Sequence, residues 1–367
     1  MVSYCSVCSD CDFGLSDVAL NWIKSYLSNR RQFVSVSGYS SPMTDVISGV
    51  PQGSVLGPIL FTVYTSPIGR HIDSFSVSHH HYADDTTLYT QLTNVDSILP
   101  PAMGDCISSL MSWFLSNDML PNPSKIELMI AGNRQQLCKH NCNQSVSVCS
   151  IAVSPVDNVK ILGVVVDKHL SFDRYVSDVC SNANYHIRAL SHIRSSLTYE
   201  MAVTLACSIV ATRIDYCNSV LNGISAANIS RLQRVQNNLA RTVCRAPRRS
   251  DTSKLLLQLH WLPIQQRIMY KTAVLTYNAL HTGQPSYIRS LLIQPIPTRT
   301  LRSSSDNLRL TVPATRTVFA SRAFSTAAPI IWNNLSMQTR SASSVDTFKR
   351  LLKTELFVSN MPDILSD

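Results

Sequence analysis

Four long amphipathic segments place the strongest constraint on the fold of this chain. Apolar residues recur with helical spacing over residues 176–197, 199–217, 227–245 and 264–281. The sequence has no uninterrupted apolar run of about 18 residues, the length that a membrane-spanning helix needs. These segments are therefore predicted to pack against one another, and the chain from about residue 175 onward is predicted to be mostly helical.

The residues before this helical part show shorter and more varied patterns. Ser16 is a favourable N-cap for a helix predicted to end at Leu27, and further helices are predicted over 55–63 and 105–115. Short strands are predicted around residues 33–36, 75–78, 87–89, 127–130 and 159–166. This mixture of helices and short strands predicts the α+β class, with an antiparallel sheet.

Positive charge is concentrated in the second part of the chain. The whole sequence carries a net charge of +9, and its 45% apolar and 15% charged residues exclude a largely disordered chain. Residues 1–230 contain 13 Lys and Arg against 17 Asp and Glu, whereas residues 231–367 contain 19 against 6. This asymmetry indicates a polyanionic partner, most simply nucleic acid, and a basic solvated surface is the alternative.

The chain has eleven cysteines and no N-terminal pattern typical of a secretory signal. Scattered cysteines in odd number favour free thiols, so an intracellular protein, cytoplasmic or nuclear, is expected rather than a secreted one. Cys5, Cys8 and Cys11 have C-x-x-C-x-x-C spacing within a leader of residues 1–13. Zinc and iron–sulfur sites commonly use four ligands, so a leader without metal is favoured and a metal site is the alternative.

The sharpest local feature is the sequence Tyr82-Ala83-Asp84-Asp85 between two strand-like segments. Neighbouring side chains of a strand point to opposite faces, so two adjacent carboxylates approach one site only at a turn or bulge. Carboxylate oxygens are ligands that Mg²⁺ prefers, together with water and substrate phosphates. The tetrapeptide therefore predicts a hairpin turn that binds Mg²⁺, and an ordinary Asp-Asp turn is the alternative.

Three further motifs stand in order around this tetrapeptide. Residues 49–61 read GVPQGSVLGPILF, residues 120–127 read LPNPSKIE, and residues 159–172 read VKILGVVVDKHLSF. Together with residues 82–85, this set resembles the reverse transcriptases of LINE-type (non-long-terminal-repeat, jockey-like) retrotransposons. The resemblance continues through RIDYCN at 213–218, LHWLP at 259–263 and APIIWN at 328–333, and it covers about residues 14–357.

The resemblance implies a set of functional residues and partners. Asp84 and Asp85 would ligate Mg²⁺ in a catalytic site, and Lys125 would act on the leaving pyrophosphate. The residues that border the template and the incoming nucleotide would be Pro51, Gln52, Gly53 and Tyr82. The strand around Gly163 is similar to the hairpin that grips the primer. RNA template and DNA primer are the implied partners, and the RNA of the element is a further candidate.

The resemblance also implies a polymerase palm that is truncated at its N-terminus. In the family the first catalytic Asp precedes the segment that resembles residues 14–32, but here only the dissimilar residues 1–13 precede it. One metal-bridging carboxylate and the fingers would then be missing, which predicts a weak or incomplete Mg²⁺ site and impaired polymerase activity. The alternative is a nucleic-acid-binding relic of a mobile element that has no enzymatic activity.

A domain order follows from these boundaries. The resemblance implies a partial palm over residues 14–175 and a helical thumb-like region over residues 176–250. A basic, mostly helical region would occupy residues 251–367, with a linker rich in Pro, Ser and Arg near 295–316. The sequence leaves the oligomeric state open.

Basic residues gather along and just after the helix predicted over 227–245. Apolar side chains form one stripe of this helix, and arginines at i, i+7 and i+11 would share another face. The arginines of interest are Arg234, Arg241, Arg245, Arg248 and Arg249. They are predicted to contact the phosphates of a polynucleotide, and a solvated helix face is the alternative.

Overall fold

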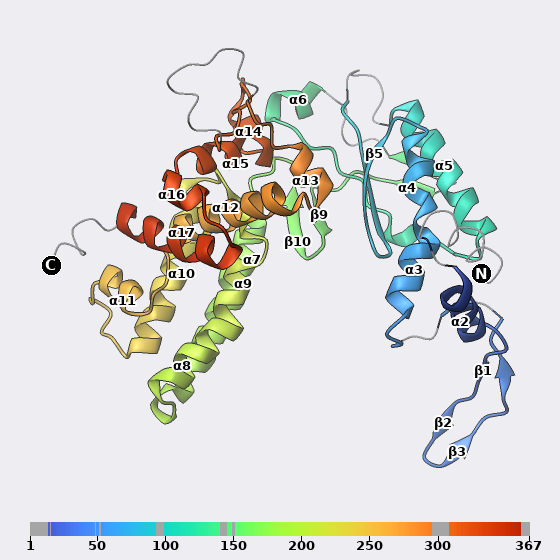
Figure 1. Ribbon diagram of the computed structural model, residues 1–367, viewed down its shortest axis with the longest axis horizontal. Coiled ribbons are helices and arrows are strands. Elements are labelled where there is room, and N and C mark those ends of the chain that lie inside the picture. Colours follow the sequence, from blue (N-terminus) through green and yellow to red (C-terminus); the bar gives the residue numbers. More distant parts are fainter. Residues whose placement is uncertain are drawn as a thin grey trace. The chain divides into compact units, whose positions relative to one another are not determined.

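The computed structural model describes residues 14, 16–47, 49–50, 53–92, 99–139, 145–148, 151–295 and 308–360. The chain divides into two compact units, Met1–Val159 and Lys160–Asp367. Helices and small antiparallel sheets are mixed in the described residues, which is compatible with the predicted α+β class (Figure 1). The predicted leader with Cys5, Cys8 and Cys11 and most of the predicted linker lie outside the described residues. The palm and thumb boundaries remain predictions.

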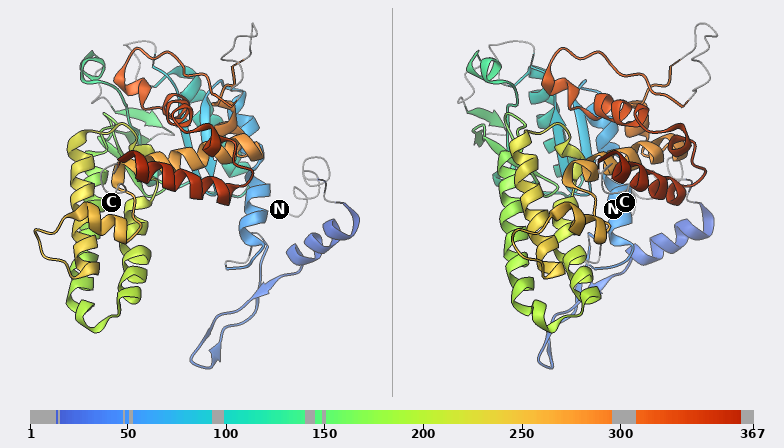
Figure 2. Two further views of the ribbon diagram at one scale, coloured as in Figure 1. Left: turned by 60° about the vertical axis from the view of Figure 1, so that its left-hand side comes forward. Right: turned by 90° about the vertical axis from the view of Figure 1, so that its left-hand side faces the viewer.

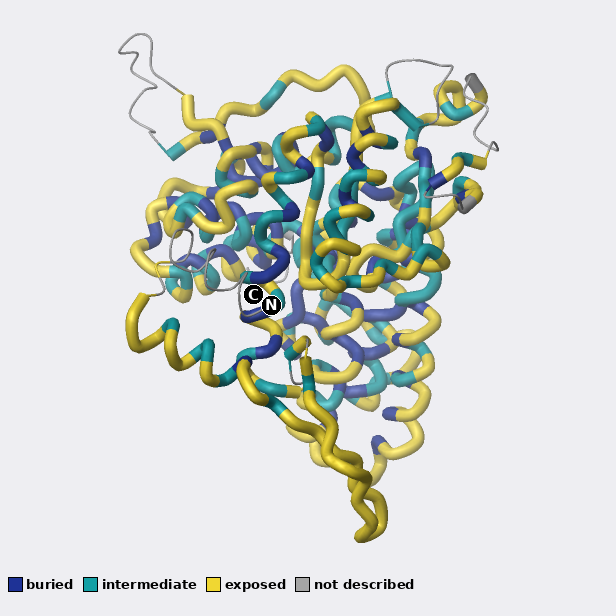
Figure 3. The backbone as a smooth tube through the Cα atoms, turned by 90° about the vertical axis from the view of Figure 1, so that its right-hand side faces the viewer, coloured by how far each residue is buried: buried dark blue, intermediate teal, exposed yellow. Residues whose placement is uncertain are grey.

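The described part of the first unit begins with a helix, which is followed by an arm of four short strands. Helix α2 spans Asp17–Leu27, as predicted, and Ser16 occupies the N-cap position without a side-chain hydrogen bond to the helix. The arm is a nested hairpin in which β1 (Arg31–Gln32) pairs with β4 (Thr44–Asp45) and β2 (Ser35–Val36) pairs with β3 (Tyr39–Ser40). All residues of these four strands are exposed, as Figure 3 shows.

Helices and a longer hairpin form the small core of the first unit. Helices α3 (Gly57–Thr65) and α4 (Pro67–Asp73) each have a proline in the first turn, where its fixed backbone angle suits a helix start. The hairpin of β5 (Ser78–Tyr82) and β6 (Asp85–Tyr89) and helix α5 (Pro101–Ser116) both contact α4. The buried side chains of this core are Ile68, Ile72, Val77, Met103, Cys106 and Leu110.

The remaining elements of the first unit are short. They are the 3-10 helix η1 (Pro123–Lys125), helix α6 (Arg134–Lys139) and the hairpin of β7 (Val146–Val148) and β8 (Ile151–Val153). The strand predicted over 127–130 is wrong, because in that segment only Leu128 forms a bridge, to Pro155. The segment is apolar enough for a strand, but a strand needs a partner that continues the hydrogen-bonded ladder.

The second unit starts at the hairpin of β9 (Asn158–Ile161) and β10 (Val164–Asp167). Helices α7 (Asp173–Ile193) and α10 (Ala226–Cys244) then lie side by side, as Figures 1 and 2 show. They run in the same direction, because Arg231 donates to Ser177 near their starts and Arg194 donates to Val243 near their ends. Their apolar stripes form much of the first core of this unit.

Further helices connect the two helices of this pair and follow them in the sequence. Between them lie η2 (Arg194–Ser196), α8 (Tyr199–Leu205), the π-helical η3 (Ala206–Ala211), α9 (Thr212–Asp215) and η4 (Asn218–Leu221). The later helices are α11 (Thr252–Gln258), α12 (Ile264–Thr282), α13 (Ser286–Ser290), α14 (Val318–Ser321), α15 (Phe324–Asn333), α16 (Met337–Arg340) and α17 (Val345–Asn360). The four predicted helical segments are thereby confirmed. Among the described residues, no helix combines the length and the apolar character needed to cross a bilayer.

A second apolar core joins α12 to the last helices. Phe348 lies between Tyr277 and Trp332, with ring centroids 4.3 Å and 5.8 Å away. The Trp332 Nε1–H donates to Leu308 O at 2.6 Å, and the Asn333 side chain bonds both backbone groups of residue 310. The APIIWN motif therefore fixes the chain at residues 308–310 onto α15.

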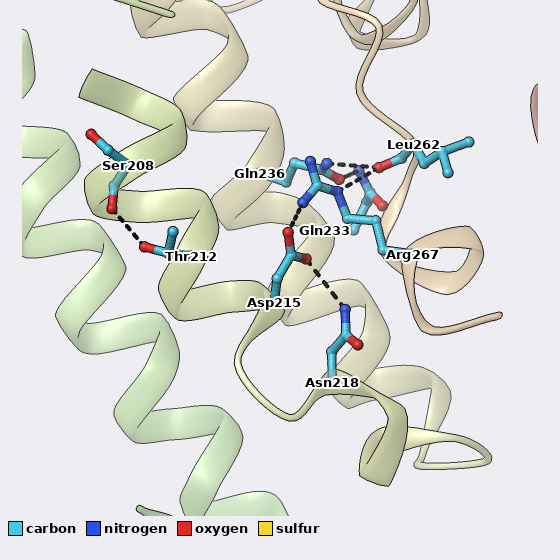
Figure 4. A network of polar contacts seen from close by, with 8 residues as sticks. All are labelled: Ser208, Thr212, Asp215, Asn218, Gln233, Gln236, Leu262 and Arg267. Carbon is cyan, nitrogen blue, oxygen red and sulfur yellow. Dashed lines mark hydrogen bonds and ion pairs between the residues drawn. The ribbon is translucent and has the colours of Figure 1, made fainter. Parts of the chain in front are cut away.

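A polar network connects the RIDYCN and LHWLP motifs (Figure 4). The Asp215 carboxylate forms an ion pair with Arg267, whose Nε–H donates to Leu262 O at 2.9 Å. The buried amide of Gln236 donates to the same carbonyl at 2.9 Å. The side chain of Gln233 accepts from the first backbone N–H of α12 at 2.9 Å. The network therefore holds α9, α10 and α12 together at the turn of residues 259–263.

Replacing Asp215 with Ala is expected to destabilise the second unit, because Arg267 loses its charged partner in a largely buried position. Hydrogen bonds to charged groups contribute about 1.5–3 kcal/mol, so the free energy of unfolding should fall by about 2 kcal/mol. The matched control is Asp178→Ala, because Asp178 and its partner Arg174 are 44% and 70% exposed and such pairs contribute about 0–1 kcal/mol. Urea unfolding measures both variants, and an equal small loss in each would contradict the role of the network.

Candidate functional site

The tetrapeptide of residues 82–85 forms a two-residue hairpin turn, as predicted. Tyr82 is the last residue of β5 and pairs with Asp85, the first residue of β6. Ala83 and Asp84 form the turn, and Ala83 adopts a positive φ of 52°. Asp84 is thus outside the alternation of the strands and stands beside Asp85 at the tip of the hairpin.

The side chains at this tip are open to solvent. Tyr82, Asp84 and Asp85 are all exposed. The described residues contain no group of three or more His, Cys, Asp or Glu side chains arranged to hold a metal ion. Two carboxylates supply the hard oxygens that Mg²⁺ prefers, but they fill only part of its octahedral shell. The donor set therefore fits Mg²⁺ in part, and water or phosphate oxygens would have to fill the other positions.

The strand predicted around residues 75–78 is displaced along the chain, because β5 spans Ser78–Tyr82 and includes His79, His80 and His81. A two-residue turn keeps the flanking strands in register up to the turn, so pairing extends through His79, His80 and His81. His79 Nδ1 is 3.5 Å from the Asp73 carboxylate on α4. Burial and then the neighbouring His79 lower the pKa of the His81 imidazole, and Asp84 opposes them only in part.

Of the predicted template-side residues near the start of α3, the structure describes Gly53. Pro51 and Gln52 lie outside the described residues. Gly53 has a φ of 79°, a conformation that favours glycine, and a Cβ built there would meet no atom within 4 Å. This geometry is that of a turn, and it leaves room for a ligand to approach the backbone. The template contact itself remains a prediction.

Lys125 is the last residue of η1 and is exposed. Asn122 caps this short helix, because its Oδ1 accepts from the backbone N–H and the hydroxyl of Ser124 at 3.1 Å and 2.7 Å. Among the described residues, no hydrogen bond or ion pair joins Lys125 to Asp84 or Asp85. The proposed action of Lys125 on pyrophosphate remains a prediction.

Four of the five arginines predicted to contact phosphates, Arg234, Arg245, Arg248 and Arg249, are exposed. Arg234 lies on α10, and Arg248 and Arg249 lie in the turn after it. The Arg234 Nε–H donates to Ser230 O of its own helix at 3.3 Å. Arg234, Arg248 and Arg249 can present N–H donors to a polyanion, and their contact with nucleic acid remains a prediction.

Arg241 and Arg245 make contacts within the second unit. Helix α10 ends at Cys244, so Arg245 does not continue the face of Arg234 as the spacing predicted. Its Nη2 instead donates to the backbone carbonyls of Arg194 and Ser195 at 2.8 Å and 2.9 Å. Arg241 is half-buried beside Asn238 Oδ1, at 3.5 Å. Arg245 therefore carries a structural role whatever else it binds.

The segment around Gly163 is two strands rather than the one predicted, with Leu162 and Gly163 in the turn between them. Tyr216 holds this turn, because its hydroxyl donates to Leu162 O at 2.5 Å. A Cβ on Gly163 would lie 3.4 Å from the Tyr216 ring. Tyr175 on α7 in turn donates to Tyr216 O at 2.9 Å. The role of this hairpin in gripping a primer remains a prediction.

Asp167 organises the loop between β10 and α7, a role that the sequence analysis missed. Its carboxylate accepts from the backbone N–H groups of His169, Ser171 and Phe172 at 3.1, 3.0 and 2.6 Å, and from the Ser171 hydroxyl at 3.2 Å. Burial alone would raise the pKa of Asp167, but these hydrogen bonds outweigh burial and lower it. The available signal was an Asp followed by a short polar loop, where Asp side chains commonly accept from nearby backbone N–H groups.

Comparisons with known proteins agree with this arrangement of motifs. Residues 11–166 match the family described as "Reverse transcriptase (RNA-dependent DNA polymerase)". The RNA-directed DNA polymerase from mobile element jockey of Drosophila melanogaster is 28% identical over 61% of this chain and 25% of that protein. The jockey polymerase of Drosophila funebris is 24% identical over 64% of this chain and 26% of its own length. The probable RNA-directed DNA polymerase from transposon X-element of Drosophila melanogaster is 25% identical over 60% of this chain and 24% of its own length.

The chain therefore contains a region of the reverse transcriptase family and is homologous to the RNA-directed DNA polymerases of jockey and related LINE-type retrotransposons. The resemblance recognised in the sequence is confirmed. The chain spans about a quarter of the length of the curated relatives it matches. No solved structure matches it.

Acidification is expected to weaken the stabilisation that Asp167 provides. Its pKa in the folded chain lies below the ordinary value of about 3.9, so the stabilisation is complete above about pH 4 and is lost as the pH falls through the lowered pKa. Asp167→Ala should therefore reduce the free energy of unfolding by about 2 kcal/mol at pH 7 and by less at about pH 3. Urea unfolding across this range measures the difference, with the exposed Asp178→Ala as control. A difference that does not change with pH would contradict this account.

Proposed function

We propose that the chain is a fragment of an RNA-directed DNA polymerase that binds RNA template, DNA primer and nucleotide with Mg²⁺. The observation that supports this proposal most is the hairpin turn with Asp84 and Asp85 at its exposed tip, within the region that matches the family. Carboxylates at an exposed tip remain hydrated and accessible to a polynucleotide, so they cost little in the free chain.

Different residues of the first unit would bind the cation, the pyrophosphate, and the template and nucleotide at this site. A bound divalent cation would supply Lewis-acid stabilisation of the charge on the transferred phosphoryl group. Asp84 and Asp85 would hold it, and Lys125 would neutralise the leaving pyrophosphate. Template and nucleotide would be bordered by Tyr82 and by Pro51, Gln52 and Gly53. Since the described tip offers two carboxylates only, we expect weak Mg²⁺ binding and low activity of this chain alone.

Primer extension by the purified chain on a primed RNA template with Mg²⁺ and deoxynucleotides should be slow. A site with only the two carboxylates of the described tip should react roughly 10²–10⁴ times more slowly than a site with a third metal-bridging carboxylate. Asp84→Asn should remove the residual extension. Asp45→Ala should not, because Asp45 is an exposed carboxylate on the β1–β4 arm.

Either of two results would contradict this prediction. Extension that survives Asp84→Asn would show that the turn is not the site. Rapid extension that depends on Asp84 would show that the site is complete.

A nucleic-acid-binding protein without catalysis is the second candidate, and the exposed arginines on α10 and in the turn after it favour it. Arg234, Arg248 and Arg249 lie in the part of the sequence that carries most of the positive charge. Binding through such side chains requires neither a metal nor an intact catalytic site. Absence of extension together with Arg-dependent binding would favour this candidate.

The affinity of the chain for nucleic acid should fall with salt, because each neutralised phosphate releases counterions. Three contacts imply a log–log slope of about −2.7 on duplex DNA and about −2.1 on single strands. Replacing Arg234, Arg248 and Arg249 together with Ala should flatten the slope by about 2–3 units and weaken all sequences about equally. Fluorescence anisotropy over a range of salt concentrations measures this.

The choice of variants follows from the contacts within the second unit. Arg174→Ala is the matched control, because Arg174 is exposed but already pairs with Asp178 on α7. Arg245→Ala is unsuitable, because it removes two hydrogen bonds to backbone carbonyls and should lower stability by about 1–2 kcal/mol. An unchanged slope in the triple variant would mean that these arginines form only a solvated surface.

A further inference from the structure

The two faces of the β5–β6 hairpin differ in what covers them. The register pairs His79 with Leu88 and His81 with Thr86, so these four side chains share one face. That face lies against α4, where His79 pairs with Asp73 and Leu88 packs onto the core. The chain itself therefore covers this face at His79 and Leu88, whereas His81 near the tip is exposed.

The opposite face presents aromatic side chains to solvent. Tyr82 is 66% exposed, Tyr89 is 47% exposed, and His80 is exposed as well. The rings of His80 and Tyr89 stack with centroids 5.3 Å apart and planes inclined by 23°. Tyr89 Oη also lies 3.3 Å from His80 Nε2, within hydrogen-bond distance. Both rings are thus held in one orientation before any ligand binds, which lowers the entropic cost of binding.

The chemistry of this face suits bases rather than phosphates. Neither β5 nor β6 contains Lys or Arg, and the face ends at Asp85, beside Asp84. These carboxylates would repel a phosphate group that is not bridged by a cation. Flat aromatic rings, in contrast, stack with the π-face of any nucleobase.

We infer that the His80–Tyr89 pair is a stacking platform for the unpaired bases of a single-stranded polynucleotide whose backbone is bound at Asp84 and Asp85. The inference rests on the proposed function and extends it. With a rise of about 3.3 Å per residue, the pair begins about 7 Å and ends about 13 Å along the hairpin from Asp85. For a strand that keeps the helical base spacing of about 3.4 Å, this distance corresponds to about two to four nucleotides from the phosphate at the tip.

Binding of a short single-stranded RNA and of its blunt duplex to the full chain tests the inference. Tyr89→Ala and His80→Ala should each weaken binding of the single strand about tenfold. The salt slope should stay that of the parent chain, because stacking releases no counterions. Tyr89→Phe should bind like the parent, because the ring remains. A 2-aminopurine base in the RNA should be quenched by the parent chain and recover its fluorescence with Tyr89→Ala.

Tyr39→Ala is the matched control, since Tyr39 is an 85% exposed tyrosine on the β2–β3 arm, and it should leave binding unchanged. Thermal unfolding checks that the variants fold. The platform is overturned if Tyr89→Ala binds the single strand as tightly as the parent does, or if the parent chain does not quench 2-aminopurine. It is also overturned if the duplex binds more tightly than the single strand and loses as much affinity with Tyr89→Ala. If the parent chain is a dimer and Tyr89→Ala makes it monomeric, this face binds a second copy of the chain, and the platform is overturned as well. If the parent chain binds no nucleic acid, the proposed function itself is overturned. If binding depends on the arginines but Tyr89→Ala binds as tightly as the parent, only the platform is overturned.

Discussion

The ion pair between Asp215 and Arg267 is the contact on which the arrangement of the second unit depends. It joins residues that are 52 positions apart, and Leu262 O beside it accepts from both Arg267 and Gln236. Arg267 is only 16% exposed, so solvent cannot replace its partner at low cost. Helices α9, α10 and α12 meet at this point, and the network joins them beside the first apolar core of the unit.

The same network reaches the loops that precede the helices. Tyr216 follows Asp215 directly in the sequence and holds the turn of the β9–β10 hairpin at Leu162. Asp167, at the end of that hairpin, accepts four hydrogen bonds from the loop that leads into α7. The downstream motifs of the sequence are thus explained by structure: they fix the helices of the second unit to one another and fix the hairpin at its start.

The features available to a polynucleotide are of three different physical kinds. The turn at Asp84 and Asp85 offers carboxylate oxygens, which need a cation between them and a phosphate. The open face of the same hairpin offers aromatic rings at His80 and Tyr89, which stack with bases and respond little to salt. The exposed arginines on α10 and in the turn after it offer positive charge, whose effect falls steeply with salt. These differences allow each feature to be measured separately in one binding experiment.

The sequence by itself determined the helices of the second unit, the turn at residues 82–85 and the resemblance to LINE-type reverse transcriptases. Helical periodicity and turn formation depend on residues within a few positions, and motif order is written in the sequence. Only the tertiary structure decided that pairing extends through His79–His81, that residues 127–130 lack a ladder, and that Arg245 bonds the carbonyl of Arg194. The strand partners of His79–His81 lie 5–9 residues away across the turn, and the carbonyl partner of Arg245 lies 51 residues away. Helical periodicity and motif order specify neither set of partners.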